Sequence, residues 1–198
     1  LPYLFRHGEA NTQGLMTGRL DIPLTRKGEE QARLWGERLR AVPFDAAWCS
    51  PLLRAKRTAE LILEANTGAL CKATTLPGLM EVSLGAWEGK SKAEVIRHYP
   101  ELWEKRGRDI VNTAPPGGES FAEVSARVLP VFKALCIEAL KYDNCLTVAH
   151  QAVNRAIIAH ATGQPPDTML EIAQPHCSLT LFALEPDSAA RILKQETM

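Results

Sequence analysis

The stretch Pro2-Tyr3-Leu4-Phe5-Arg6-His7-Gly8-Glu9 is the most informative part of the chain. Its first four residues form a short apolar run that stops at an arginine, a histidine and a glycine, which predicts a buried strand entering a loop. A second run of this kind, Cys145 to Ala149, stops at His150. Ligands of open α/β sheets bind beyond the carboxyl ends of the strands. We therefore expect His7 and His150 to meet at one rim of a sheet.

Predicted strands and helices alternate along the rest of the chain. Thr25 and the pair Ser50-Pro51 are typical starts of helices, and Ser91 with Glu94 and Ser120 with Glu123 fit capping boxes. We expect strands at 2–5, 46–49, 73–76, 145–149, 179–184 and 191–194, and helices at 25–39, 50–65, a short one from 91, 120–142 and 153–162. The last two strands form a hairpin around Glu185-Pro186-Asp187. This order predicts a three-layer α/β/α fold with a mixed, mostly parallel sheet.

The segment 77–119 differs from its surroundings because it is rich in glycine and proline. We interpret it as a small, cap-like insertion over the carboxyl rim of the sheet. The chain has 198 residues, which is the size of one domain. We therefore expect residues 1–198 to form a single domain.

Charge and hydropathy exclude several classes of protein. Lys and Arg number 23, Asp and Glu also number 23, and the pI is about 7.1. Proteins that bind nucleic acids or membrane surfaces usually carry a basic excess, so neither partner is expected. The chain has no apolar run of about 18 residues, so no membrane-spanning helix is expected. A small molecule is the predicted partner, and the oligomeric state stays open.

Five cysteines, an odd number without any C-x-x-C motif, argue against a disulfide framework or a zinc site. We expect reduced thiols in the core and hence a reducing, cytoplasmic compartment. The chain starts at Leu1 rather than Met, which indicates that residues before it were trimmed or processed. The apolar run before Arg6 is too short for a signal peptide.

Two arginines are expected near the predicted histidine rim. Arg6 offers the planar fork of donors that suits phosphate or carboxylate, and its charge disfavours a proton on the neighbouring His7. Gly8 allows the backbone to approach a ligand closely. Arg54 falls in the first turn of the helix after Ser50-Pro51, where the helix dipole adds positive charge. These features predict an anion site with a neutral, nucleophilic His7.

Structural alternatives exist for each of these residues. A single histidine is more often structural than functional, a glutamate such as Glu81 can be a surface carboxylate, and Arg54, Lys56 and Arg57 can form a solvated helix face. The three histidines without a preceding strand are expected at the surface or in ordinary packing: His98, His160 and His176.

Six sequence blocks follow one another in a fixed order. They are Leu4-Phe5-Arg6-His7-Gly8-Glu9, Asp21-Ile22-Pro23-Leu24-Thr25 with Gly28 and Gln31-Ala32, Ser50-Pro51-Leu52-Leu53-Arg54-Ala55 with Thr58-Ala59, Leu79-Met80-Glu81 with Gly85 and Trp87-Glu88-Gly89, Pro116-Gly117-Gly118-Glu119-Ser120, and Val148-Ala149-His150. Together they resemble the motifs of the histidine phosphatase superfamily, which has the phosphoglycerate-mutase-like fold. The resemblance covers essentially the whole chain.

The resemblance implies a role for each matching residue. His7 is the nucleophile that forms a phosphohistidine intermediate. Arg6, Arg54 and His150 hold the three equatorial oxygens of the phosphoryl group. Glu81 protonates the leaving oxygen and then activates water, which requires a raised pKa. No metal and no cofactor is implied.

Further positions follow the family less closely. Asn11 is implied as a supporting phosphate donor, although it stands two residues nearer to Arg6-His7-Gly8-Glu9 than in most members. Thr17 and Gly18 are implied to lie along the substrate loop. Gln151 and Ala152 replace the usual glycines after the second histidine, which is similar to the fructose-2,6-bisphosphatase branch. Gln151 is thereby implied as a phosphate donor.

Three functions fit these observations. A metal-independent phosphomonoester hydrolase is favoured, because the insertion before Ser120 is short and the block Trp87-Glu88-Gly89 is typical of phosphatases; the nearest branches are the α-ribazole phosphatases and the broad-range small phosphatases. A phosphoglycerate mutase-type phosphotransferase is the first alternative. The second alternative is a non-catalytic phosphate-binding regulator. Such a protein would not need a nucleophile paired with an acid.

Overall fold

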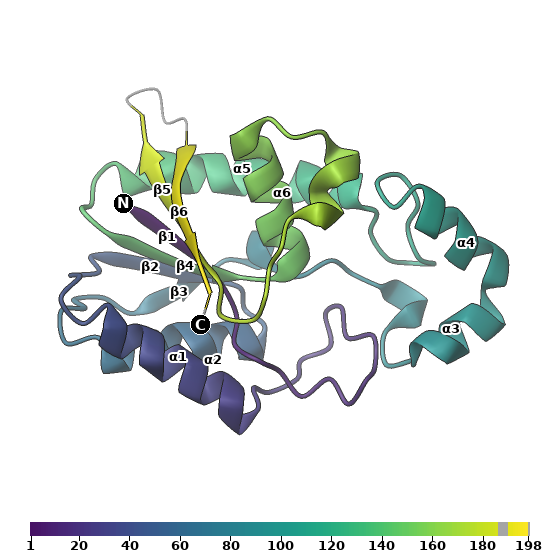
Figure 1. Ribbon diagram of the computed structural model, residues 1–198, viewed down its shortest axis with the longest axis horizontal. Helices are drawn as coiled ribbons and strands as arrows, with labels where there is room; N and C mark the ends of the chain where they lie inside the picture. The colour runs from purple at the N-terminus through teal and green to yellow at the C-terminus, as the bar shows by residue number, and fades with distance from the viewer. Residues whose placement is uncertain (186–189, 198) are drawn as a thin grey trace.

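The strands of this computed structural model, which describes residues 1–185 and 190–197, form one six-stranded sheet in the order β3-β2-β4-β1-β5-β6 (Figure 1). Neighbours among β1 to β4 pair in parallel, whereas β5 is antiparallel to both β1 and β6. The predicted mixed, mostly parallel sheet is thus confirmed, as is the pairing of the last two strands; residues 186 and 187 of the predicted turn lie outside the described residues. The strands are β1 (Pro2–Arg6), β2 (Ala46–Cys49), β3 (Ala73–Thr75), β4 (Cys145–Ala149), β5 (Leu179–Leu184) and β6 (Ala190–Glu196).

Helices cover both faces of the sheet (Figure 1). On one face lie α1 (Arg26–Arg38) and α2 (Leu53–Ala65), and on the other lie α5 (Phe121–Ala139) and α6 (Gln151–Thr162). Side chains of β1 alternate between the two layers, since successive residues of a strand point to opposite faces. Phe5 packs edge-on against Trp35 of α1 at 5.2 Å between ring centroids, whereas Leu4 joins the cluster built from α5 and α6. The predicted three-layer architecture is therefore confirmed.

The predicted starts of α1, α3 (Lys92–His98) and α5 are correct, whereas those of α2 and α6 are not. Thr25 caps α1, and both capping boxes form as expected. The prediction that Ser50 caps the second helix is wrong, because α2 begins at Leu53. The N–H of Leu53 instead donates to Asp21 Oδ1 at 2.6 Å. The carboxylate of a distant loop thus supplies the cap, which no local pattern reveals.

Two other helix ends also differ from the prediction. Helix α6 begins at Gln151, two residues earlier than expected, so that His150 is its N-cap residue. Helix α5 ends at Ala139 rather than near Tyr142. The earlier start of α6 matters most, because it brings a helix N-terminus directly behind His150.

The segment 77–119 lies beyond the end of the sheet at which the parallel strands finish (Figure 1). It contains two short helices where one was expected, and Pro100, which suits the first position of a helix, starts the second of them. Trp87 is fully buried there and packs against Trp103 at 5.6 Å between ring centroids. The elements are η1 (Pro77–Leu79), η2 (Gly85–Trp87), α3 (Lys92–His98) and α4 (Pro100–Arg108), and η3 (Pro166–Glu171) follows α6 further along the chain.

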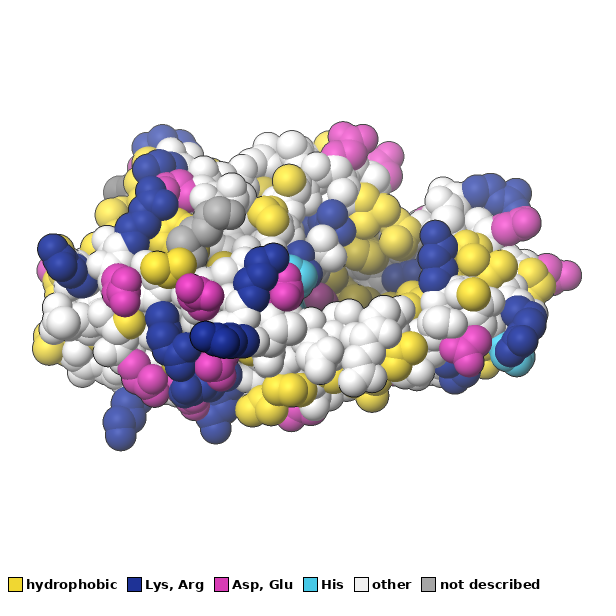
Figure 2. Space-filling model, turned by 60° about the horizontal axis from the view of Figure 1, so that its bottom comes forward, with side chains coloured by type: hydrophobic (Ala, Val, Ile, Leu, Met, Phe, Trp, Pro, Cys, Tyr) yellow, Lys and Arg dark blue, Asp and Glu magenta, His cyan; other side chains and the backbone are white. Residues whose placement is uncertain are grey.

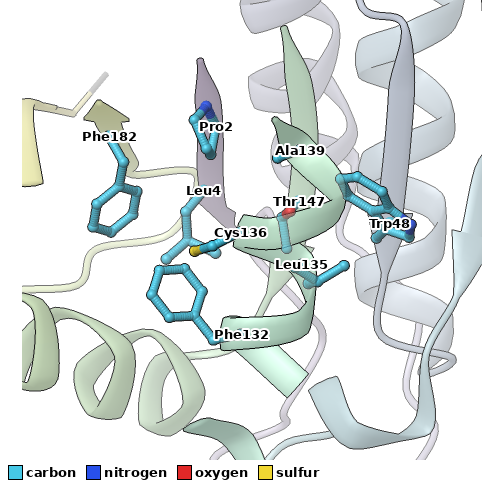
Figure 3. Close-up of a pocket in the computed structure, with 9 residues that line it drawn as sticks. All are labelled: Pro2, Leu4, Trp48, Phe132, Leu135, Cys136, Ala139, Thr147 and Phe182. Atoms are coloured by element: carbon cyan, nitrogen blue, oxygen red, sulfur yellow. The ribbon is translucent and has the colours of Figure 1, made fainter. Parts of the chain in front are cut away.

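A small gap lies between α5 and the sheet, among apolar side chains that include Leu4, Phe132 and Phe182 (Figure 3). Its volume is about 20 Å³, which is close to the minimum for one water molecule. Because a water also needs polar partners and this lining is almost wholly apolar, the gap is a packing imperfection and not a binding site.

The five cysteines lie in the described part of the chain, and none of them forms a disulfide. Four are buried and Cys71 is half-buried, and burial raises the pKa of the Cys177 thiol to about 12. The expectation of free core thiols is confirmed for these four. No helix in the described ranges is both long and apolar enough to cross a membrane.

Candidate active site

The two histidines that follow strands meet at the carboxyl rim of the sheet. Strands β1 and β4 are neighbours, and Arg6 lies opposite Ala149 in their register. His7 and His150 therefore leave the sheet side by side, with ring centroids 5.0 Å apart. Both side chains are buried. The meeting predicted from the sequence is confirmed.

A cavity of about 260 Å³ opens at this rim. Figure 2 shows this side of the molecule hollowed between the sheet and the α3–α4 segment, with hydrophobic side chains along the hollow. The lining combines charged and polar side chains with apolar ones. The lining residues are Arg6, His7, Ala10, Thr12, Leu15, Met16, Thr17, Gly18, Ile22, Arg54, Glu81, Val82, Leu84, Gln151 and His176.

The ring of His7 has one free nitrogen. His7 Nδ1 lies 2.7 Å from the carbonyl oxygen of Gly8, and since a carbonyl can only accept, Nδ1 must carry the hydrogen. Nε2 is then left with its lone pair in the neutral ring. Burial, reinforced by Arg54 and Arg6, lowers the pKa of His7 well below its ordinary value. The ring is therefore neutral near pH 7 and has the tautomer that a nucleophilic Nε2 requires.

Gly8 is required where the chain packs against α1. A Cβ atom at Gly8 would lie 2.4 Å from the carbonyl oxygen of Gly28 in α1. The N–H of Gly8 donates to Thr58 Oγ1 at 3.0 Å, and that hydroxyl donates to the Arg54 carbonyl at 2.7 Å. Contacts to α1 and α2 thus fix the backbone directly after His7.

The guanidinium of Arg6 is anchored on one side and open on the other. Its Nη1 donates to the carbonyl oxygen of Gln174, and its Nη2 donates to His176 Nε2 at 3.0 Å. Its Nε is buried and has no hydrogen-bond partner in residues 1–185 and 190–197. Burial lowers the pKa of Arg6 to about 10. This value is still well above 7, and the guanidinium therefore stays cationic near neutral pH. Arg6 therefore presents a fixed charge with an unused donor.

Arg54 is buried at the same rim and is not part of a solvated helix face, with only 2% of its surface exposed. Its Nη1 donates to the carbonyl of Leu20 at 2.8 Å, and its Nη2 donates to that of Gly18 at 2.7 Å. The arginine thus also braces the loop that carries Thr17 and Gly18. Both of these loop residues line the cavity, as predicted.

His150 has two buried ring nitrogens without any hydrogen-bond partner among the described residues. Buried polar atoms in native proteins are nearly always paired. Burial, together with the neighbouring His7, lowers the pKa of His150 well below its ordinary value. His150 is fully buried and is not itself a lining residue, but its unpaired ring lies directly behind His7, which lines the cavity.

Glu81 enters the cavity from the 77–119 segment. Its Oε1 accepts from the N–H groups of Val82 at 3.0 Å and Ala152 at 3.1 Å, the latter in the first turn of α6. Burial raises the pKa of this carboxyl despite those bonds and the charges of Arg54 and Arg6. A carboxyl that holds its proton to unusually high pH is suited to act as a general acid.

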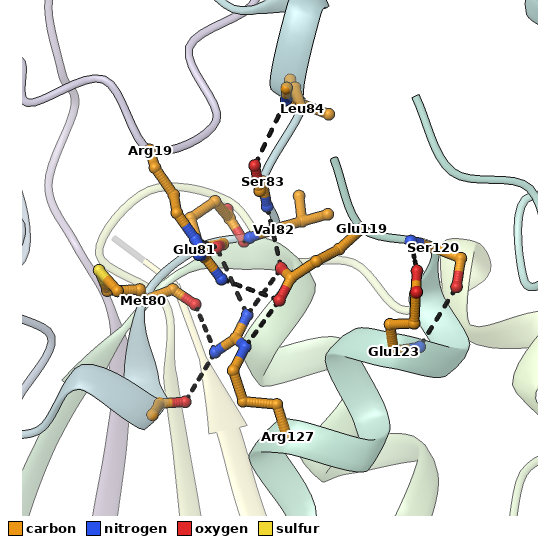
Figure 4. A network of polar contacts seen from close by, with 12 residues as sticks. Arg19, Met80, Glu81, Val82, Ser83, Leu84, Glu119, Ser120, Glu123 and Arg127 are labelled. Atoms are coloured by element: carbon orange, nitrogen blue, oxygen red, sulfur yellow. Dashed lines mark hydrogen bonds and ion pairs between the residues drawn. The ribbon is translucent and has the colours of Figure 1, made fainter. Parts of the chain in front are cut away.

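A polar network that sequence reasoning missed holds the backbone of Glu81 (Figure 4). Arg127 of α5 makes two parallel bonds of 3.0 Å to the carboxylate of Glu119 and donates to the carbonyl of Met80 at 3.0 Å. Arg19 bonds the same carboxylate at 2.8 Å and the Glu81 carbonyl at 3.0 Å. The block Pro116–Ser120 had marked Glu119 without giving it a role. Glu119 lies at the centre of this network, which joins the loop of Arg19, α5 and the backbone of Glu81.

Of three further positions, two differ from the expectations. Asn11 has an exposed side chain and does not line the cavity, whereas its neighbour Thr12 does. Gln151 lines the cavity as predicted. His176, which was assigned to the surface or to packing, lies with its ring 5.6 Å from that of His7. No strand directly precedes His176, so the pattern that identified the other two histidines was absent.

The charges in the cavity come from side chains of the protein. Arg6 and Arg54 are the two lining residues with a permanent positive charge in the described part of the chain. No three side chains of His, Cys, Asp or Glu within residues 1–185 and 190–197 form a group that could hold a metal ion. The arrangement can bind one compact anion against an unprotonated histidine nitrogen and beside a carboxyl of raised pKa.

Comparisons with known proteins agree with this geometry. The sequence model of the histidine phosphatase superfamily (branch 1) matches residues 2–195. The adenosylcobalamin/alpha-ribazole phosphatase of Escherichia coli K12 is 36% identical over 84% of this chain and 81% of its own, and the 2,3-bisphosphoglycerate-dependent phosphoglycerate mutase 2 of Gloeobacter violaceus is 33% identical over 93% of this chain and 85% of its own. The solved alpha-ribazole phosphatase of Shigella flexneri superposes with a TM-score of 0.87 at 30% identity, covering 96% of this chain and 93% of that one.

Proposed function

The chain belongs to the histidine phosphatase superfamily, and on that premise we propose that it hydrolyses a small phosphate monoester through a phosphohistidine on His7. The observation that carries the proposal is the pairing of a free His7 Nε2 with a nearby carboxyl of raised pKa, in a cavity whose cations are two arginines. A phosphoryl group there is flanked by Arg6, Arg54 and His150. Charge stabilisation by such donors is the main requirement of phosphoryl transfer.

In the first step, His7 Nε2 attacks phosphorus and the bond from phosphorus to the ester oxygen breaks. Glu81, protonated because its pKa is raised, gives its proton to the departing oxygen. The unpaired Nε of Arg6 and the unpaired ring of His150 supply donors to the equatorial oxygens. The products are an alcohol, a phosphohistidine and a Glu81 carboxylate.

In the second step, the Glu81 carboxylate takes a proton from water as the water oxygen attacks phosphorus. The bond between phosphorus and Nε2 breaks, which returns the electron pair to His7. Inorganic phosphate leaves, and Glu81 is protonated again. One carboxyl thus serves as acid and then as base, in keeping with the bonds that hold its Oε1 in a fixed position.

Hydrolysis is favoured over a mutase reaction by the charge of the cavity wall. A phosphoglycerate mutase has to hold a carboxylate and a second phosphate besides the reacting one. Besides Arg6, Arg54 and Glu81, the described residues that line the cavity include no Lys, Arg, Asp or Glu, and Leu15, Met16 and Leu84 are apolar. Such a wall suits a monoester whose leaving group is neutral.

We further propose that the 77–119 segment acts as a cap on one domain, and that the protein works in the cytoplasm, where its thiols stay reduced.

The test is release of phosphate from para-nitrophenyl phosphate in EDTA by the wild type and by His7→Ala, with Glu81→Gln alongside. We expect turnover by the wild type and none by His7→Ala. Para-nitrophenolate is a good leaving group that needs no acid, so Glu81→Gln should still form the phosphohistidine but hydrolyse it slowly. Mass spectrometry at alkaline pH, where phosphohistidine is stable, should detect one added phosphoryl group on His7.

His160→Ala is the matched control, because His160 is exposed at the end of α6. Equal turnover by the wild type and His7→Ala would refute the assignment of the nucleophile. Transfer of the phosphoryl group to 3-phosphoglycerate in preference to water would favour the mutase. Phosphate binding without any turnover would favour the regulator.

A further inference from the structure

We propose that His176 is a positioning residue that holds the Arg6 guanidinium in its phosphate-binding orientation. His176 Nε2 lies 3.0 Å from Arg6 Nη2. Since a guanidinium can only donate, the ring accepts this bond and carries its own hydrogen on Nδ1. This inference rests on the proposed function only in that Arg6 binds the phosphate.

The bond fixes the plane of the guanidinium. Arg6 Nη1 is held by the carbonyl of Gln174, two residues before His176, so a single short segment takes hold of two of the three nitrogens. The third nitrogen, Nε, has no partner within the described part of the chain. Without the His176 bond, the guanidinium could rotate about the remaining contact. A guanidinium donates well-aligned hydrogen bonds to a phosphate only while its plane is held in the right orientation.

The backbone around His176 is built to aim the ring at the cavity. Cys177, the next residue, has a left-handed φ of 55°, which is uncommon for any residue with a Cβ atom. Its N–H donates to the His7 carbonyl at 3.1 Å, and its carbonyl accepts from Trp35 Nε1 at 2.8 Å. Strained conformations of this kind persist where the surroundings over-determine them and cluster at functional sites. The turn directs His176 to within 5.6 Å of the His7 ring.

The surroundings of His176 keep its Nε2 able to accept a hydrogen bond from Arg6. Burial and the charge of Arg6 lower the pKa of His176 to about 4, and Lys27 acts in the same sense while Glu9 opposes them. The ring is therefore neutral at pH 7. A neutral ring accepts from the arginine, whereas an imidazolium would have no lone pair to offer and would repel it.

The experiment compares His176→Gln with His176→Leu. The two side chains are similar in size, and only glutamine offers an acceptor oxygen to Arg6 Nη2. Binding of inorganic phosphate is measured by titration calorimetry at pH 7, and KM and kcat are measured with para-nitrophenyl phosphate. We expect His176→Leu to weaken phosphate binding about tenfold, the effect of losing a hydrogen bond to a charged group, and His176→Gln to stay within about twofold of the wild type. His160→Leu, an exposed change of the same type, should have no effect.

A double-mutant cycle with Arg6→Lys tests whether His176 acts through the arginine. Lysine keeps the charge but lacks Nη2, so His176→Leu should cost less than about twofold in that background. Equal losses in His176→Gln and His176→Leu, or a full additional loss in the Arg6→Lys background, would overturn the proposal. Calorimetry needs no turnover, so a phosphate-binding protein that hydrolyses nothing would refute the phosphatase and leave this test intact. A wild type that binds no phosphate would overturn both.

Discussion

Glu119→Gln tests whether the network behind the active site positions the acid. The carboxylate of Glu119 accepts two bonds of 3.0 Å from Arg127, one of 2.8 Å from Arg19 and one of 3.0 Å from the Ser83 N–H. The amide of glutamine has one acceptor oxygen and no charge. The substitution therefore leaves both arginines short of a partner and points an amide N–H₂ toward one of the donors.

The cost follows from the exposure of the three side chains, which is 18% for Glu119, 22% for Arg127 and 29% for Arg19. Breaking a fully buried ion pair costs about 3–5 kcal/mol, and an exposed pair contributes less than about 1 kcal/mol. This network lies between those limits, so we expect a loss of about 2 kcal/mol in the free energy of unfolding. For a chain of 198 residues, that lowers the melting temperature by about 4–8 °C.

Activity should fall as well, because Arg19 and Arg127 hold the backbone of Glu81. We expect kcat for an ester with a poor leaving group to fall about tenfold, since protonation of that group depends on where the acid lies. The assays are thermal unfolding and phosphate release from an alkyl phosphate and from para-nitrophenyl phosphate. Glu138→Gln, which removes an exposed pair with Lys141, is the control. Equal losses of kcat for the two esters would refute a role through the acid, and an unchanged melting temperature would refute the energetic argument.

Three more outcomes are expected. Gly8→Ala should lower the free energy of unfolding by about 1–3 kcal/mol, because its Cβ would lie 2.4 Å from the Gly28 carbonyl oxygen. Gly107→Ala in α4 should raise the free energy of unfolding by about 0.5–1 kcal/mol, because a Cβ there meets nothing within 4 Å. Urea unfolding measures both changes. Folding raises the pKa of Glu81, so the free energy of unfolding should fall as the pH rises from the ordinary carboxyl range to the pKa of the folded state. Glu81→Gln should remove this loss when urea unfolding is measured across that range. A wild type whose free energy of unfolding has no such slope would contradict the prediction. Inorganic phosphate at about 100 times its Kd should stabilise the wild type by about 2.7 kcal/mol in thermal unfolding, and markedly less in His150→Ala if the unpaired ring binds the anion.

The layered sheet and the meeting of His7 with His150 could be predicted because both depend on local patterns. Short apolar runs that stop at a polar residue mark strand ends, and neighbouring parallel strands end at one rim. Helix caps that use the next few residues, such as Thr25, were equally visible. Their physical basis lies within one turn of chain.

The parts that could not be predicted depend on contacts between distant segments. Asp21 caps α2 across 32 residues, and Glu119 joins Arg19 to Arg127 across 100 and 8 residues. His176 reaches Arg6 across 170 residues through a turn that no strand precedes. Nothing in the spacing of single residues encodes such pairs, since they arise only once the sheet and its loops have closed on one another.

The placement of His7 and His150 on adjacent central strands also bears on how the molecule opens. The amide of His7 donates to Ala149 within the sheet, and its carbonyl accepts from Cys177. Hydrogen exchange at this amide should therefore require global unfolding, whereas loop amides between residues 10 and 25 should exchange through local opening. His7 and His150 thus lie in the region expected to open most slowly, whereas Leu15 and Met16, which line the cavity, lie in a loop expected to open faster. Substrate range can then drift by loop replacement while the spacing of the histidine pair is preserved.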